Sequence, residues 1–493
     1  MGLDAMDDLF MNVVTNDMFN VCNVMFSLGG FFLLLFRMRG GAPLWPQNAP
    51  LQALQVENSV ERSQNKATGR GSPLPTDPRA AGVVGSMVHG SDRGGRSRSV
   101  SIIVPARNES HNILPLLESL IRLHPPPLEV IVLDDQSEDD TFAKAKAFAR
   151  RWAEAPRSSS ESPFPIHVVK GAPRPQEASL TVKTESRDFT HNPSPHGAWN
   201  SPEAPDTNAA PRLWNGKQWA CHQGAQMAKG DYLLFTDADT IHHPASLEAA
   251  VSFAERHNYD LISALPFHRC AAWWDRLLGP FQVWLLAMTN PFGHPTPHRL
   301  FAIGQYLLFQ REGYFGCGGH RAVCNQLAED IPLAQRVLNR RPEGYGVYSE
   351  TALFEVQMYG SLGEFFRGWR RNFRAGFELT SPWLGCDAFL YISAITGSGN
   401  VFRELGPTLV ALMTVILLMW QQRRLGRFSF LGPLLFPLSL AMFCAVSLCA
   451  LFDKVCRRDQ KWKGRHHSPL PEKRRKALGF IHGDIRHHCE PSE

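Results

Sequence analysis

The sequence lacks the cysteine spacing of a disulfide-rich or zinc-binding protein. Its ten cysteines are spread from Cys22 to Cys489, and no two of them form a C-x-x-C pair. This pattern argues against a disulfide framework and a zinc ribbon, and it suits a chain whose catalytic part lies in a reducing compartment. Cys317, His320 and Cys324 are close in sequence, but they lack an evident fourth ligand, and scattered cysteines are usually small core residues.

A strong net charge and a motif that reads DNA or RNA are also missing. Among 493 residues, 51 basic and 46 acidic side chains leave a formal net charge of +5. The basic excess lies in particular places, which is typical of membrane topology rather than of nucleic-acid binding. We therefore expect a membrane protein of more than one domain, with no nucleic-acid partner.

The first apolar run, residues 19–36, has no basic residue before it. Acidic residues precede it, and Arg37 and Arg39 follow it directly. A cleaved signal peptide has the reverse order, with basic residues first. The run therefore predicts an uncleaved membrane anchor whose C-terminal side lies in the cytoplasm.

Composition divides the whole chain into segments. Two long apolar runs near the C-terminus are candidate membrane spans. The tail after them is basic, which favours a cytoplasmic location for the tail. The loop between the runs carries three arginines, which favour a cytoplasmic location for the loop instead. A weaker run at 388–401 is either a third span or an interfacial piece. The expected segments are a short N-terminal segment (1–18), the anchor (19–37), a disordered linker (38–98), a folded domain (99–380) with a disordered insertion (171–212), a C-terminal membrane region (381–453) with spans near 405–420 and 428–452, and a basic cytoplasmic tail (454–493).

The folded domain alternates short apolar strands with amphipathic helices. This rhythm predicts an α/β fold with a mostly parallel sheet built from right-handed crossovers. Residues 273–288 are rich in tryptophan and leucine, and they form either an interfacial membrane segment or a buried core helix. Residues 316–320 are expected to be a flexible turn. The expected strands are 100–104, 129–133, 166–170, 232–235, 260–265, 305–310 and 347–351.

Two carboxylates follow one of these strands. Asp237 and Asp239 are separated by a single residue, so in an extended segment their side chains point the same way. Hard oxygen ligands of this kind suit Mg²⁺ or Mn²⁺, with water and a diphosphate completing the shell. The alternative is an acidic turn that caps the next helix.

Two further acidic clusters accompany this pair. Asp134 and Asp135 end a strand, where they are able to accept hydrogen bonds from a nucleobase or ribose. Glu329 and Asp330 begin a helix, where one carboxylate is able to remove a proton from an acceptor hydroxyl. Acidic residues are common at helix N-termini, so each cluster also has a purely structural interpretation. The arginines at 370, 371 and 374 either neutralise a departing diphosphate or form a basic face near the membrane.

Together these motifs resemble the family 2 glycosyltransferases, which are membrane-attached enzymes with a GT-A fold, a Rossmann-like and mostly parallel sheet. The most similar branch is associated with glycosylation of hopanoid and carotenoid lipids. The resemblance covers residues 100–377 apart from the insertion. It rests on the segments 104–109, 133–137, 215–220, 234–240, 318–320 and 329–334.

The resemblance implies a role for each motif. The divalent ion, Mn²⁺ or Mg²⁺, would be held by Asp237 and Asp239, and Asp330 would be the catalytic base. The residues expected to bind the nucleotide sugar are Pro105, Ala106, Arg107, Glu109, Asp134, Asp135, Lys217 and Asp237. The residues expected near the acceptor or the diphosphate are Gly318, Gly319, His320, Glu329, Trp369, Arg370 and Arg371.

Processive relatives carry a Gln-x-x-Arg-Trp motif, whereas residues 369–372 here read Trp-Arg-Arg-Asn. The departure favours transfer of one sugar over polymer synthesis. We therefore expect an inverting transferase that moves a single hexose from a UDP-sugar to a hydroxylated lipid (carotenoid, hopanoid or sphingolipid-like). It would be an integral membrane protein with its catalytic domain on the cytoplasmic side. The alternatives are transfer to a polyprenyl phosphate, and a catalytically silent membrane scaffold with the same fold.

Overall fold

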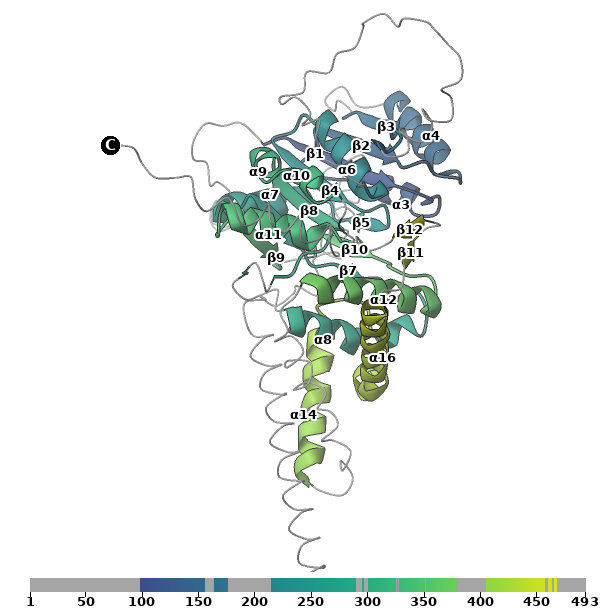
Figure 1. Ribbon diagram of the computed structural model, residues 1–493, viewed down its shortest axis with the longest axis vertical. Helices are drawn as coiled ribbons and strands as arrows, with labels where there is room; N and C mark the ends of the chain where they lie inside the picture. The colour runs from purple at the N-terminus through teal and green to yellow at the C-terminus, as the bar shows by residue number, and fades with distance from the viewer. Residues whose placement is uncertain are drawn as a thin grey trace, which may run out of the picture.

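A seven-stranded sheet organises the structure, with strand order β3-β2-β1-β4-β8-β6-β9 (Figure 1). β1 pairs in parallel with β2 and β4, and β2 pairs in parallel with β3. β8 lies antiparallel between β4 and β6, and β6 pairs in parallel with β9. The sheet confirms the predicted α/β class and its mostly parallel character. The strands are β1 (Val100–Ala106), β2 (Glu129–Asp134), β3 (Ile166–Lys170), β4 (Tyr232–Thr236), β6 (Leu261–Ala264), β8 (Tyr306–Gln310) and β9 (Tyr345–Tyr348).

The computed structural model describes residues 98–155, 164–175, 214–289, 295–296, 300–324, 326, 328–350, 352–379, 405–456, 460–462 and 465–467. The predicted anchor, most of the linker, most of the insertion, the run at 388–401 and most of the basic tail lie outside these residues.

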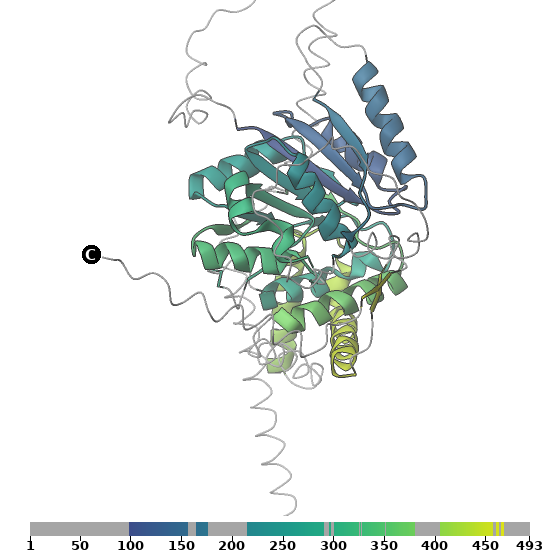
Figure 2. The same cartoon turned by 45° about the horizontal axis from the view of Figure 1, so that its top comes forward.

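Helices cover both faces of the sheet (Figure 2). Side chains alternate along a strand, so Ile102 and Val104 of β1 pack in one core, whereas Ile103 packs in the core on the other face. Because both faces are buried, the strands read as continuous apolar runs rather than as an alternating pattern. The helices around the sheet are α3 (Ile113–Leu120), α4 (Thr141–Glu154), α6 (Gly216–Met227), α7 (Ser246–His257), α9 (Arg311–Gly316), α10 (Gly319–Ala322) and α11 (Asp330–Arg340).

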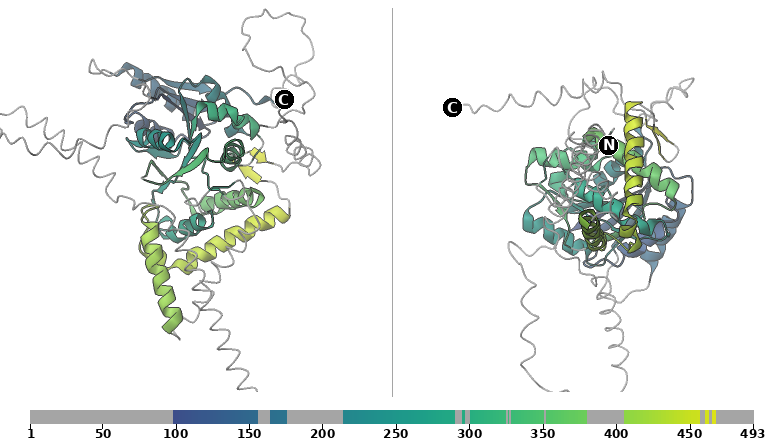
Figure 3. Two further views of the ribbon diagram at one scale, coloured as in Figure 1. Left: turned by 90° about the vertical axis from the view of Figure 1, so that its left-hand side faces the viewer. Right: turned by 90° about the horizontal axis from the view of Figure 1, so that it is seen from below.

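A second layer lies below the sheet domain and consists mainly of C-terminal helices (Figures 1 and 3). α14 projects away from the domain, whereas α16 runs obliquely beneath α12. A third apolar cluster, which includes Phe281, Trp284, Phe365 and Phe443, joins α8, α12 and α16. The elements are the small sheet β5 (Thr240–His242), β10 (Phe354–Val356) and β7 (Phe267–His268), the 3₁₀ helix η1 (Asp275–Leu277), the helices α8 (Gly279–Thr289), α12 (Leu362–Leu379), α14 (Leu405–Gln422), α15 (Leu431–Leu434) and α16 (Phe436–Val455), and the hairpin β11 (Gln460–Trp462) and β12 (Arg465–His467).

The structure bears on three local predictions. Residues 273–288 contain η1 and most of α8. Much of α8 is buried in the third apolar cluster, so the core-helix alternative describes α8, whereas Trp273 before it is exposed. Residues 316–320 include the predicted turn, which joins α9 to α10, and Gly318 and Gly319 have φ values of +86° and +49° there. The apolar run 428–452 is not one helix, since Leu435 separates α15 from α16.

Within the described part of the chain, α16 is the one helix long and apolar enough to cross a bilayer. Residues 405–420 do form a helix, α14, but the stretch of it that qualifies as apolar is the shorter Ala411–Gln422. For the C-terminal region, where the sequence predicts two spans, the described residues therefore contain one possible span.

Candidate active site

One edge of the large sheet gathers the predicted acidic clusters. Asp134 is the last residue of β2, and Asp237 directly follows β4. The carboxyl ends of parallel strands meet at one edge, which is where open α/β sheets bind ligands. β8 is antiparallel to β4, so its amino end, next to Gly304, lies at the same edge.

Lys217 links two of the clusters. Its Nζ atom lies 2.8 Å from Oδ1 of Asp237 and 2.7 Å from Oε1 of Glu329. Burial opposes the charge on Lys217, but the two carboxylates outweigh this effect and raise its pKa well above the ordinary value. The first turn of α6, the end of β4 and the start of α11 are thereby joined through one ammonium group.

Glu329 and Asp330 are neighbours with different environments. Burial acts to raise the pKa of Glu329, but the charge and hydrogen bond of Lys217, together with His320, leave that pKa below its ordinary value, so Glu329 stays ionised. Asp330 accepts a hydrogen bond from the Gly304 amide at 3.1 Å, and burial together with the charge of Glu329 raises its pKa to about 7. A carboxylate with a pKa near neutrality is suited to general base chemistry. The structure therefore distinguishes an ion-paired carboxylate from one that is able to exchange a proton.

Asp239 has the features of a metal ligand. Its Oδ1 atom is buried and has no hydrogen-bond partner within the described residues. Burial, followed by the charges of Asp237 and Glu109, raises the pKa of Asp239 to about 7. A divalent cation would satisfy the orphaned oxygen and offset the repulsion between carboxylates, so the donor set fits Mg²⁺ or Mn²⁺. The described residues contain no group of three or more His, Cys, Asp or Glu side chains able to hold a metal. Phosphate and water oxygens are further ligands that suit these ions.

The end of β2 offers a second orphaned acceptor. Asp134 is 2% exposed, and its Oδ1 atom has no hydrogen-bond partner within the described residues. Its other oxygen, Oδ2, accepts a hydrogen bond from the Ser137 amide at 3.3 Å. A buried acceptor without a partner is costly, and a ligand N–H or O–H would satisfy it.

The segment after β1 supports this loop. Arg107 donates hydrogen bonds to the carbonyl oxygens of Asp135 and Gln136, at 2.8 and 3.0 Å. Ala106 accepts a hydrogen bond from the Asp135 amide at 2.8 Å, and Pro105 precedes it in β1. Arg107 therefore fixes the backbone of the Asp135 loop, which is an indirect way to shape a pocket.

Two arginines of α12 have different surroundings. Arg370 forms an ion pair through Nε and Nη2 with the carboxylate of Asp453 in α16, and its predicted place near the acceptor or the diphosphate stays a prediction. Arg371 lies near the cluster: burial lowers its pKa, while the hydroxyl of Tyr359 and the carboxylates of Glu329 and Asp237 act in the opposite direction. Adjacent helical residues point about 100° apart, so both cannot face the same partner.

Other residues predicted near the acceptor or diphosphate belong to the protein interior. His320 is 1% exposed, its Nδ1 atom lies 2.9 Å from the Tyr314 hydroxyl, and burial lowers its pKa to about 3. A Cβ atom on Gly319 would lie 2.6 Å from the Tyr314 ring. These contacts pack His320 and Gly319 against Tyr314. The charges of Glu329 and Lys217 also act on His320, so its predicted place near the acceptor stays a prediction. Trp369 lies in the third apolar cluster.

Sequence reasoning missed two residues of the cluster. Gln218 is buried and donates a hydrogen bond to Glu329 at 3.3 Å; it stands inside the 215–220 segment, so its position next to Lys217 was the available signal. Gly304 donates its amide to Asp330, and a Cβ atom there would lie 3.0 Å from Glu329 and 3.1 Å from Lys217. Nothing in the sequence around Gly304 distinguishes it from other glycines.

The chain is similar to several known proteins. The family model described as Glycosyl transferase family 2 matches residues 101–169 and 210–324. The 4,4'-diaponeurosporenoate glycosyltransferase of Staphylococcus haemolyticus (strain JCSC1435) is 24% identical over 394 residues, which cover 76% of this chain and 90% of that protein. The protein of the same name from Staphylococcus aureus (strain MRSA252) is 23% identical over 400 residues, with 75% and 88% coverage. Among solved structures, the mannosyltransferase PcManGT from Pyrobaculum calidifontis, in complex with GDP-Man and Mn²⁺, aligns with a TM-score of 0.44 at 15% identity, covering 88% of this chain and 99% of that chain.

Proposed function

Because this chain is a family 2 glycosyltransferase with an α/β fold of the GT-A type, we propose that it transfers one hexose from a UDP-sugar to a hydroxylated lipid acceptor at the cytoplasmic face of a membrane. One observation carries the proposal. Lys217 joins Asp237 to Glu329, which brings the carboxylates after β4 together with Asp330, the neighbour of Glu329. A donor diphosphate and an acceptor group would thus meet at one edge of the sheet.

The donor would bind across the ends of β2 and β4. The buried Oδ1 atom of Asp134 is the proposed acceptor for a nucleobase or ribose donor. Asp237 and Asp239 would hold Mn²⁺ or Mg²⁺, which, when bound, neutralises diphosphate charge. Lys217 and Arg371 add positive charge from the protein, which would stabilise the UDP leaving group.

The acceptor would react beside Asp330. For a hydroxyl acceptor, Asp330 would take the proton as the oxygen attacks the anomeric carbon, and the bond between that carbon and the diphosphate would break with inversion. The Gly304 amide holds Asp330 at 3.1 Å and so fixes the base at the edge of the sheet. The Staphylococcus relatives are named for an acid, diaponeurosporenoate. A carboxylate or phosphate acceptor is already an anion, so it would need no base.

Apolar surfaces of α14 and α16 support the membrane location. They expose large apolar side chains, and contiguous surfaces of this kind mark membrane or protein contacts. We propose that this layer faces the bilayer together with the anchor at 19–37, and that the basic tail stays in the cytoplasm. The exposed residues are Leu409, Leu412, Met413, Ile416 and Trp420 in α14, and Leu438, Leu448, Leu451, Phe452 and Val455 in α16.

Lipid analysis tests the proposed reaction. Cells expressing the full chain should contain a lipid heavier by one hexose, detected by mass spectrometry of a lipid extract. The species should vanish with Asp239→Ala and persist with Asp140→Ala, an exposed aspartate whose side chain makes no helix-capping hydrogen bond. If wild-type and Asp239→Ala cells have the same lipids, the chain is better explained as a catalytically silent scaffold.

A further inference from the structure

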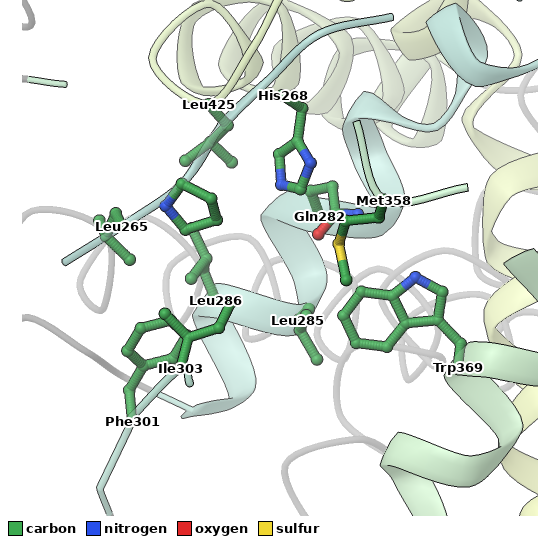
Figure 4. Close-up of a pocket in the computed structure, with 11 residues that line it drawn as sticks. Leu265, His268, Gln282, Leu285, Leu286, Phe301, Ile303, Met358, Trp369 and Leu425 are labelled. Atoms are coloured by element: carbon green, nitrogen blue, oxygen red, sulfur yellow. The ribbon is translucent and has the colours of Figure 1, made fainter. Parts of the chain in front are cut away.

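A narrow pocket lies between the large sheet and the second layer (Figure 4). α8 contributes Leu286, and the segment before β8 contributes Phe301 and Ile303. Met358, from the chain after β10, and Trp369 of α12 close it on another side. The pocket therefore lies where the sheet domain meets the helices that expose apolar surface.

Two walls of this pocket continue directly into the candidate active site. Ile303 lines the pocket, and the next residue, Gly304, donates its amide to Asp330. Met358 also lines the pocket, and the next residue is Tyr359. Burial raises the pKa of the Tyr359 hydroxyl to about 12, while the charge of Arg371 acts to lower this pKa and the charge of Asp239 acts to raise it. Consecutive Cα atoms are about 3.8 Å apart, so the pocket borders the candidate active site.

The pocket has an apolar wall and one unsatisfied polar group. The Nε1 atom of Trp369 is buried without a hydrogen-bond partner in the described part of the chain. Figure 4 shows this nitrogen on the edge of the indole that faces Met358 and Gln282. A buried N–H donor without a partner is destabilising, and an oxygen atom of a ligand would satisfy it.

The size of the pocket limits its occupant. Its cavity volume is about 30 Å³. A cavity that accommodates one six-membered aromatic ring measures about 150 Å³. The space suits a few carbons of an unbranched chain and is too small for a fused ring system.

We propose that this pocket binds the oxygen-bearing end of a linear lipid acceptor, with the first chain carbons against Leu286 and Ile303 and an oxygen atom accepting from Trp369 Nε1. The assignment rests on the proposed function and deepens it, because it selects linear chains over ring-bearing lipids such as hopanoids. The rest of the chain would extend along the apolar helices toward the bilayer.

Photolabelling tests the site without requiring turnover. The full-length protein in detergent is irradiated with oleic acid carrying a diazirine close to its carboxyl group, and labelled peptides are mapped by mass spectrometry. The proposal expects labels within 282–286, 301–303 or 369, and competition by unlabelled oleic acid and oleyl alcohol but not by cholesterol. Labels confined to the outer surfaces of α14 and α16 would overturn it, because they would show only a general lipid-facing surface.

Variants at Leu286 test the same site through affinity. Leu286→Phe fills the pocket and should weaken oleic acid competition about ten-fold, the effect of excluding roughly two methylene groups. Leu440→Phe is the matched control, since Leu440 lies in the same apolar cluster but does not line the pocket. Trp369→Phe keeps an aromatic ring and removes the donor, so it should weaken competition by about five- to ten-fold.

UDP binding, measured by calorimetry on the same samples, separates the two levels of the proposal. If the wild type binds UDP and glycosylates lipid while Leu286→Phe and Leu440→Phe have equal affinities for oleic acid, the pocket assignment is wrong and the glycosyltransferase proposal stands. If the wild type neither binds UDP nor glycosylates any lipid, the proposed function itself fails.

Discussion

The ion pairs of Lys217 allow a quantitative test of the site. In Lys217→Met, the carboxylates of Asp237 and Glu329 lose their shared cation, although their side chains are only 28% and 8% exposed. Removing one partner of a buried ion pair costs about 3–5 kcal/mol, and the partial exposure of Lys217 and Asp237 reduces the expected loss to about 3 kcal/mol. For a domain of this size the apparent Tm should fall by about 6–12 °C.

A double-mutant cycle isolates the interaction. Glu329→Gln removes one of the stranded charges, so it should destabilise the Lys217→Met protein less than it destabilises the wild type, with a coupling energy of about 1–3 kcal/mol. Thermal unfolding of the detergent-solubilised protein, followed by fluorescence, measures all four species. The exposed Lys229, just beyond the same helix, gives the control Lys229→Met, which should change stability by less than about 0.5 kcal/mol. Strictly additive effects of the two substitutions would refute the described linkage.

Three further outcomes are expected. With a hydroxyl acceptor, kcat/KM should rise with pH to a plateau above about 7, because Asp330 acts as a base only when it is deprotonated. The Asp330→Asn substitution should lower kcat about 10²- to 10⁴-fold. A flat pH profile and an active Asp330→Asn enzyme would indicate an acceptor that is already an anion. Arg370→Met should leave UDP affinity unchanged while lowering the unfolding midpoint, because Arg370 pairs with Asp453; a marked loss of UDP affinity would return Arg370 to the diphosphate site. Gly319→Ala should destabilise the protein by about 1–3 kcal/mol in denaturant unfolding, because φ is +49° and the added Cβ meets Tyr314; an unchanged midpoint would contradict this packing.

The sequence predicted most of the strands, because buried strands read as short apolar runs bounded by turn residues. The direction of β8 was not predictable, since an apolar run has the same pattern in parallel and antiparallel pairing. Residues 273–288 were ambiguous for a related reason. A helix that is apolar on most sides has the same composition whether it packs against protein or lies against lipid.

The sequence also supplied the chemical groups of the candidate site but not their pairing. Acidic residues at the ends of strands were visible, whereas the contact of Lys217 with both Asp237 and Glu329 depends on how β4, α6 and α11 meet in space. The arginines at 370 and 371 differ because helical geometry points them in different directions, and only the packing of α16 decides which one forms an ion pair.

Metal-dependent nucleotide binding tests the central claim most directly. Isothermal titration of the full-length protein with UDP, with and without Mn²⁺, should show binding that is tighter in Mn²⁺ by about ten-fold or more. Asp239→Asn should abolish this enhancement, and Asp140→Asn should preserve it. UDP binding that is absent, or equally strong with and without the ion in both variants, would contradict the proposal that these carboxylates hold a sugar nucleotide through a divalent cation.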